Sequence, residues 1–155
     1  ANLMNAVRGF KPVVWIAPNT DGGSAEVRAM LDSAPSDRYD SNWSIRQHIQ
    51  HDDFFDLLLK ASVVVGNSSV GIRECSYLGI PVVDIGTRQR LRERGRNVIH
   101  VDGKVTKVIR DAVKAQAEHR RFKSDLLYGD GKAGLSIAGH LAEIVHKVDI
   151  PALVG

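Results

Sequence analysis

The stretch that decides the fold is GNSSVGIRECSYLGIPVVDIGTRQR, residues 66–90. An apolar run at residues 62–65 leads into it, and a second apolar run, residues 81–85, lies inside it. Between the two runs, residues 69–78 have the apolar spacing of a helix, and Gly79 follows at a position where helices commonly end. A strand, a helix and a second strand in this order predict a right-handed crossover between parallel strands.

The alternation of strands and helices continues on both sides of this unit. Further strands are predicted at residues 12–17, 43–49 and 97–101, and further helices at residues 24–33, 52–61, 104–123 and 132–148. The pattern is typical of an α/β protein with a three-layer, doubly wound parallel sheet of the Rossmann-like kind. Ligands bind such sheets beyond the carboxyl ends of the strands, so we expect residues 18–19, 66–69 and 86–88 to line one crevice.

The composition fits a single domain, residues 1–155, or one lobe of a larger protein. Hydrophobic residues make up 43% and charged residues 25% of the chain, and no run approaches the roughly 20 apolar residues of a membrane span. Cys75 is the single cysteine, and the first residues lack the apolar core of a signal peptide, which predicts a cytoplasmic location. The net charge of +3 permits an anionic ligand without requiring nucleic acid.

Two adjacent hydroxyls, Ser68 and Ser69, fall between a buried strand and the start of the next helix. Free backbone N–H groups gather at such a position and the hydroxyls add donors, so it suits a phosphate. Gly66 and Gly71 on either side are expected to leave room for a close ligand. The alternative role of either serine is a plain N-cap, worth about 1 kcal/mol.

A carboxylate and a guanidinium follow these serines. Glu74 lies about a turn and a half into the predicted helix, where its carboxylate can accept hydrogen bonds from both hydroxyls of a ribose. The alternative is a solvent-facing glutamate paired with Arg73. Arg88 follows the next strand, and arginine makes bidentate contacts to phosphate. The arginines of residues 90–96 are expected mostly to form a solvated basic loop.

Polar residues also follow two other predicted strands. Asn19 either meets a sugar or phosphate or serves as a turn residue. His48 and the backbone of Ile49 lie at another strand end. His48 and His51 are close in sequence but have no third partner, so no metal site is predicted.

A glycine-rich turn, YGDGKA at residues 128–133, precedes the last helix. Asp130 and Lys132 in this turn either contact the ligand or belong to a loop in which Asp130 caps the helix. Cys75 is predicted to pack against the sheet rather than to act as a nucleophile.

These segments resemble the carboxyl-terminal half of the UDP-N-acetylglucosamine 2-epimerases, most closely the hydrolysing branch. In order, the matching segments are APNTDGGS, VVGNSSVGIRE, LGIPVVDIGTRQ, RNVIHV and YGDGKA, which together cover nearly the whole chain. One departure is Leu91, where the family tends to have glycine. The resemblance implies one Rossmann-like lobe of a glycosyltransferase-B-like architecture, with the active site between two lobes. It also implies that the catalytic acid and base belong to the amino-terminal lobe, so no catalytic residue is expected here.

The resemblance further implies that this lobe binds UDP. The implied substrate-binding residues are Asn19, Ile49, Ser68, Ser69, Glu74 and Arg88. The serines would hold the diphosphate, the glutamate the ribose diol and the arginine the phosphate side, while the asparagine lines the cleft and the isoleucine supports the uracil. Further candidates for substrate contact are His48, Gly71, Gln89, Asp130 and Lys132.

By resemblance, the full-length protein converts UDP-N-acetylglucosamine and water to N-acetylmannosamine, a precursor of sialic acid, and UDP, and the isolated lobe is inactive. No cofactor or metal is expected. The expected partners are the UDP-sugar, the amino-terminal lobe and further copies in a homo-oligomer, with neither nucleic acid nor membrane. Two other functions compete with this one. A UDP-sugar glycosyltransferase lobe shares the serine–glutamate arrangement, and a basic module could bind RNA or an acidic partner, although no aromatic residue lies between Arg88 and Arg96.

Overall fold

The computed structural model describes residues 2–17, 24–32, 43–47 and 49–147. Its strands are β1 (Val13–Ile16), β2 (Trp43–Arg46), β3 (Val64–Gly66), β4 (Val82–Ile85) and β5 (Val98–Val101). Its helices are α1 (Asn2–Ala6), α2 (Ser24–Asp32), α3 (His51–Lys60), α4 (Ser69–Ile72), α5 (Glu74–Leu78), α6 (Thr106–His119) and α7 (Ala133–Lys147). Every predicted strand and helix is present within these ranges. The short helix α1 was not predicted, because a helix of five residues is too short to show a periodic pattern of apolar residues.

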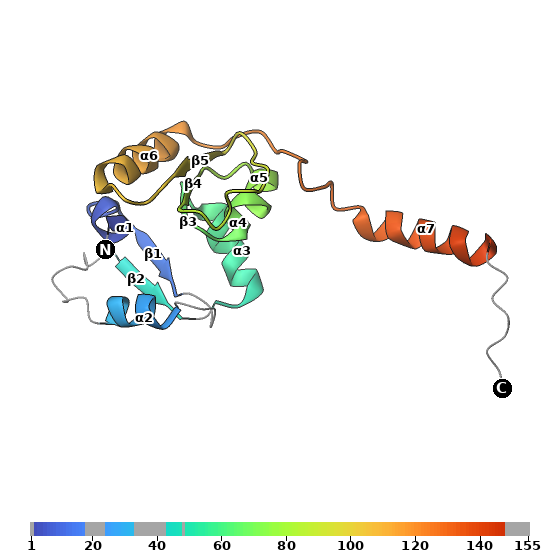
Figure 1. Ribbon diagram of the computed structural model, residues 1–155, viewed down its shortest axis with the longest axis horizontal. Helices are drawn as coiled ribbons and strands as arrows, with labels where there is room; N and C mark the ends of the chain where they lie inside the picture. The colour runs from blue at the N-terminus through green and yellow to red at the C-terminus, as the bar shows by residue number, and fades with distance from the viewer. Residues whose placement is uncertain (1, 18–23, 33–42, 48, 148–155) are drawn as a thin grey trace.

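The strands pair in parallel, as the alternating pattern predicts (Figure 1). Within the described residues, β1 pairs with β2, and β4 lies between β3 and β5. The α/β class is confirmed, but the hydrogen bonds define two sheets rather than the single expected one. β3 is three residues long, and Val13 of β1 and Val65 of β3 both pack against one hydrophobic cluster, so the two sheets share a core.

Helices cover both faces of the three-stranded sheet. Val83 of β4 belongs to a buried cluster with residues of α1 and α6, and Val82 to a cluster with residues of α3 and α5. The two valines face opposite ways because successive side chains of a strand alternate. Asp84 therefore points to the same face as Val82, where α4 and α5 lie.

The helix predicted at residues 69–78 consists of two short helices, α4 and α5, joined at Arg73. The Arg73 N–H still donates to the Ser69 carbonyl at 2.9 Å, so the chain continues to coil across the join. α5 ends at Gly79 as predicted, in the left-handed conformation with φ 65°. A Cβ atom at Gly79 would lie 2.1 Å from the carbonyl oxygen of Phe122, so this turn admits only glycine.

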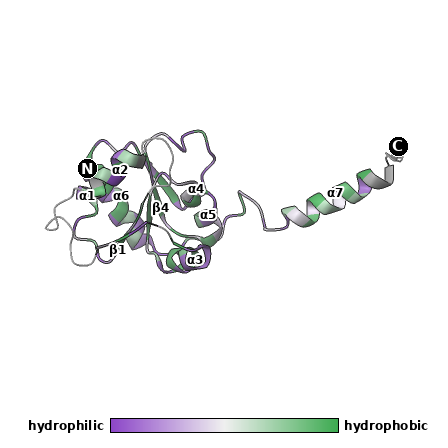
Figure 2. Cartoon of the chain, turned by 90° about the horizontal axis from the view of Figure 1, so that it is seen from below, coloured by the Kyte–Doolittle hydropathy of each residue, from purple (hydrophilic) through white to green (hydrophobic). Residues whose placement is uncertain are grey.

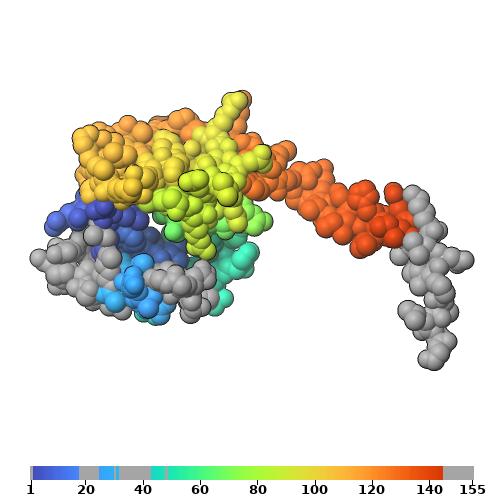
Figure 3. Space-filling view, viewed as in Figure 1, coloured from blue at the N-terminus to red at the C-terminus, as the bar shows by residue number. Residues whose placement is uncertain are grey.

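The last helix, α7, stands clear of the rest of the molecule (Figures 1 and 3). Hydrophobic residues run along it in Figure 2, and Leu135, Leu141 and Ile144 are among those exposed to solvent. The predicted helix is confirmed, whereas nothing in the sequence indicated that it would extend away from the sheet. In the part of the chain that the structure describes, no helix combines the length and hydropathy needed to cross a membrane.

Candidate functional site

The two serines lie where the sequence places them, between β3 and α4. Ser68 is exposed and is the N-cap of α4, because its hydroxyl oxygen accepts from the Val70 N–H at 3.4 Å. Ser69, the first residue of α4, is half-buried. The N-cap role of Ser68 does not use its hydroxyl hydrogen, so the same hydroxyl can donate to a ligand.

The two glycines that flank the serines have different surroundings. Gly66 has φ 148°, and a Cβ atom there would meet nothing within 4 Å, so the loop is open on this side as expected. Gly71 is buried, and a Cβ atom there would lie 2.9 Å from Cγ1 of Val82. The space at Gly71 is therefore used for the close approach of α4 to β4 rather than being left open for a ligand.

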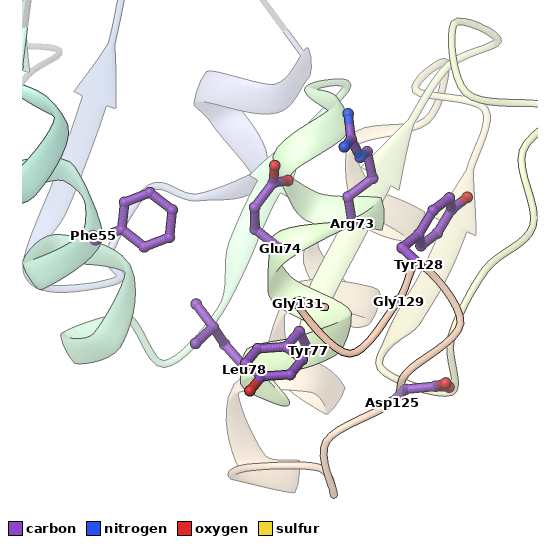
Figure 4. Close-up of a pocket in the computed structure, with 9 residues that line it drawn as sticks. All are labelled: Phe55, Arg73, Glu74, Tyr77, Leu78, Asp125, Tyr128, Gly129 and Gly131. Atoms are coloured by element: carbon purple, nitrogen blue, oxygen red, sulfur yellow. The ribbon is translucent and has the colours of Figure 1, made fainter. Parts of the chain in front are cut away.

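Glu74 begins α5 and borders a hollow of about 380 Å³ (Figure 4). Aromatic side chains of Phe55, Tyr77 and Tyr128 line the same hollow. The glutamate is half-buried, and its Oε2 atom is buried with no hydrogen-bond partner among the described residues. An unpartnered buried acceptor costs about 1–3 kcal/mol, so a ligand hydroxyl that donates to this oxygen would bind favourably.

The loop after β4 is tied directly to the loop that carries the serines. Arg88 is exposed, whereas Gln89 beside it is only 3% exposed. The Gln89 Nε2 donates to the backbone carbonyl of Asn67 at 2.8 Å. The two loops after β3 and β4 are thus brought together as predicted, while the third expected loop, with Asn19, lies outside the described residues.

Beneath this loop lies a buried polar cluster that the sequence reasoning missed. Asp84 is 1% exposed, and its Oδ2 accepts from Arg94 Nη2 at 3.3 Å and pairs with His100 Nδ1 at 2.9 Å. Arg94 Nη2 also donates to the carbonyl of Gln89 at 3.0 Å. The expectation of a solvated basic loop is therefore wrong for Arg94. The available signal was the aspartate inside the apolar run PVVDI, since a buried charge requires partners.

The remaining candidate residues within the described ranges are Ile49, Asp130 and Lys132, and the last two contact each other. Ile49 is half-buried between β2 and α3, at the carboxyl end of β2, and His48 beside it lies outside the described residues. Asp130 accepts from the Lys132 N–H at 3.0 Å, and the Lys132 ammonium lies 3.7 Å from the same carboxylate. Both residues are exposed and belong to a loop, as the alternative to ligand contact predicts. Asp130 does not cap α7, because the Lys132 N–H precedes the helix and the first helical bond goes to the Lys132 carbonyl.

Cys75 is a packed residue, as predicted. It is fully buried in the cluster with Leu58, Ile80 and Val82. Burial, and to a lesser extent the neighbouring Glu74 carboxylate, raises the pKa of the Cys75 thiol to about 12. A thiol with this pKa is not a nucleophile at neutral pH. No group of three His, Cys, Asp or Glu side chains in the described ranges is arranged to hold a metal ion.

Parallel strands covered by helices and followed by polar loops at their carboxyl ends define an α/β domain of the Rossmann-like kind. Residues 1–142 match the model of the family described as UDP-N-acetylglucosamine 2-epimerase. The chain therefore belongs to the UDP-N-acetylglucosamine 2-epimerase family, as the sequence motifs predict.

Individual relatives agree with this membership. A UDP-N-acetylglucosamine 2-epimerase of Neisseria meningitidis serogroup B is 35% identical over 87% of this chain and 34% of its own length. A UDP-N,N'-diacetylbacillosamine 2-epimerase (hydrolyzing) of Legionella pneumophila is 32% identical over 77% of this chain and 31% of its own length. Polysialic acid biosynthesis protein P7 of Escherichia coli is 28% identical over 75% of this chain and 30% of its own length. The chain thus spans about a third of the length of these curated relatives.

Proposed function

We propose that this chain is the UDP-binding lobe of a hydrolysing UDP-N-acetylglucosamine 2-epimerase. The observation that carries the proposal is the bond from Gln89 to the Asn67 carbonyl, which joins the serine loop to the loop of Arg88. Hydrogen-bond donors of both loops can then bind the same anionic group at the carboxyl ends of β3 and β4. The Neisseria and Legionella relatives are both 2-epimerases, which supports this activity, and the Legionella relative is a hydrolysing one, which supports the hydrolysing outcome.

The proposed role of the lobe is to hold the leaving group. In the reaction, the C2–H bond of the sugar breaks, its electron pair forms a C1–C2 double bond, and the C1–O bond breaks to release UDP. Water then adds across the double bond, which gives free N-acetylmannosamine. Negative charge grows on the diphosphate as UDP departs, so donation from Ser68, Ser69 and Arg88 stabilises the transition state more than the bound substrate.

Glu74 has a separate role in the proposal. Its unpartnered Oε2 faces no competing donor among the described residues, and the carboxylate borders the hollow with aromatic walls. A ribose diol offers the two hydroxyl donors that a carboxylate accepts best. We therefore assign the ribose of UDP to Glu74.

The 155-residue chain is expected to bind UDP at least about tenfold more tightly than UMP, because a second phosphate adds charge-assisted hydrogen bonds. It should also bind UDP more tightly than ADP, whose purine differs in size from uracil. Isothermal titration calorimetry with the three nucleotides measures both differences. Equal affinities for all three would rule out a UDP site.

The variant Glu74→Gln is expected to weaken UDP binding by about 1–3 kcal/mol, the contribution of a hydrogen bond to a charged group. The loss should be smaller for the 2′,3′-dideoxyribose analogue of UDP, which has no diol to donate. Glu118→Gln, at an exposed glutamate of α6, is the matched control and should leave both affinities unchanged. Equal losses of Glu74→Gln on UDP and on the analogue would remove the ribose assignment.

A further inference from the structure

Gln89 is a buried polar residue whose position is not explained by contact with UDP. With 3% of its surface exposed, its side chain does not face a ligand in the crevice. Its amide instead donates to the carbonyl of Asn67, the residue before Ser68. The bond fixes the backbone from which the serine loop begins.

Gln89 is itself held from the sheet. Its carbonyl accepts from the Arg92 N–H at 3.1 Å and from Arg94 Nη2 at 3.0 Å. Arg94 is anchored by Asp84, which lies on the central strand β4 and is almost fully buried. A continuous set of contacts therefore runs from β4 through Asp84, Arg94 and Gln89 to Asn67, and Arg88 lies beside Gln89 in the sequence.

We propose that Gln89, held by Arg94 and Asp84, is a positioning residue that fixes the spacing between the serine loop and Arg88 for a diphosphate. The inference rests on the proposed function.

No helix lies in the connection between β4 and β5. Among the described residues, the loop around Arg88 has only two turn bonds of its own, from the Arg90 N–H to the Thr87 carbonyl and from the Arg92 N–H to the Gln89 carbonyl, and neither ties it to the serine loop. Ordering a loop on binding costs conformational entropy and lowers the affinity for the ligand. A hydrogen bond that fixes the loop before binding removes this cost.

The chain offers a matched control in Gln116. It is also buried, at 2% exposure, and its Nε2 donates to two backbone carbonyls, those of Val82 at 2.8 Å and Asn97 at 2.7 Å. Val82 is the first residue of β4, and Asn97 is the residue before β5. Both carbonyls therefore lie at the amino-terminal ends of the strands, opposite the crevice. Gln116→Met thus removes buried hydrogen bonds that lie at the far end of the β4–β5 connection, away from Arg88 and from the serine loop.

The test compares Gln89→Met with Gln116→Met. Gln89→Met is expected to lower UDP affinity about tenfold while changing UMP affinity less, so that the preference for UDP over UMP shrinks. Gln116→Met is expected to keep the preference of the unmodified chain, whatever its effect on stability. Without ligand, the NMR amide signals of Ser68 and Ser69 should shift in Gln89→Met and stay in place in Gln116→Met.

The outcomes separate the two proposals. If the unmodified chain does not bind UDP, the proposed function fails whatever the variants do. If it binds UDP and Gln89→Met keeps both the preference for UDP and the amide signals, the positioning role is overturned and the proposed function stands. Gln89→Glu provides a second variant should Gln89→Met not fold, because it keeps the length of the side chain but has no N–H to donate to Asn67. An unchanged preference for UDP in Gln89→Glu would overturn the inference equally.

Discussion

Asp84→Ala is expected to lower the free energy of unfolding by about 1–3 kcal/mol, because it removes a buried acceptor that two partly exposed side chains share. Arg94, whose side chain is 24% exposed, would lose its carboxylate, and His100 would lose the same partner. Urea denaturation followed by circular dichroism measures the change. Asp84→Asn should cost less, since the amide oxygen can still accept one hydrogen bond.

Asp111→Ala is the control for this experiment. Asp111 also pairs with a cation, Lys107, but on the exposed surface of α6. An exposed pair of this kind contributes at most about 0.5 kcal/mol. If the two alanine variants lost similar stability, the contacts of Asp84 would contribute no more to the free energy of unfolding than an exposed ion pair does.

Arg88→Ala is expected to reduce UDP affinity on the order of 30- to 100-fold, the scale of one charge-assisted hydrogen bond to a phosphate. Arg88 follows β4 after the two residues Gly86 and Thr87, next to Gln89, whose side chain binds the serine loop. Arg96→Ala, at an exposed arginine of the same loop, should change affinity by less than about threefold. Calorimetric titration with UDP at two salt concentrations measures both, and salt should weaken any contribution of Arg96 first.

The comparison of these two arginines decides how the loop acts. Equal damage from both would mean that the loop attracts UDP as a collective basic surface and that no single arginine is positioned. Arg94 cannot serve as the control, because its bonds to Asp84 and to the Gln89 carbonyl help to hold the loop itself.

The order of strands and helices could be predicted because its signals are local. The apolar run of β4, the helical spacing before Gly79 and the glycine itself each lie within a few residues of the element that they specify. The serine loop is predictable for the same reason, since a strand end followed by Ser68 and Ser69 indicates both an N-cap and a group of donors.

The sequence could not show which residues meet across the fold. The alternating arginines of the β4–β5 loop look equivalent, and only the path of the chain brings Arg94 back to Asp84. Gly71 likewise resembles a glycine that makes room for a ligand until Val82 is seen to fill the space. Helix α7 has the pattern of a helix with one apolar face, but that pattern does not specify what the face contacts.

The close contact of Gly71 with Val82 also restricts the order in which this part of the chain can mutate. A methyl group at position 71 would lie 2.9 Å from Val82 Cγ1, so it fits only after the side chain at position 82 has become smaller. The intermediate with alanine at 71 and valine at 82 is overpacked, whereas the intermediate with a smaller residue at 82 has only a cavity. A library that varies position 71 must therefore vary position 82 with it, whereas position 66 is restricted by its own backbone conformation, with φ 148°, and not by a neighbouring side chain.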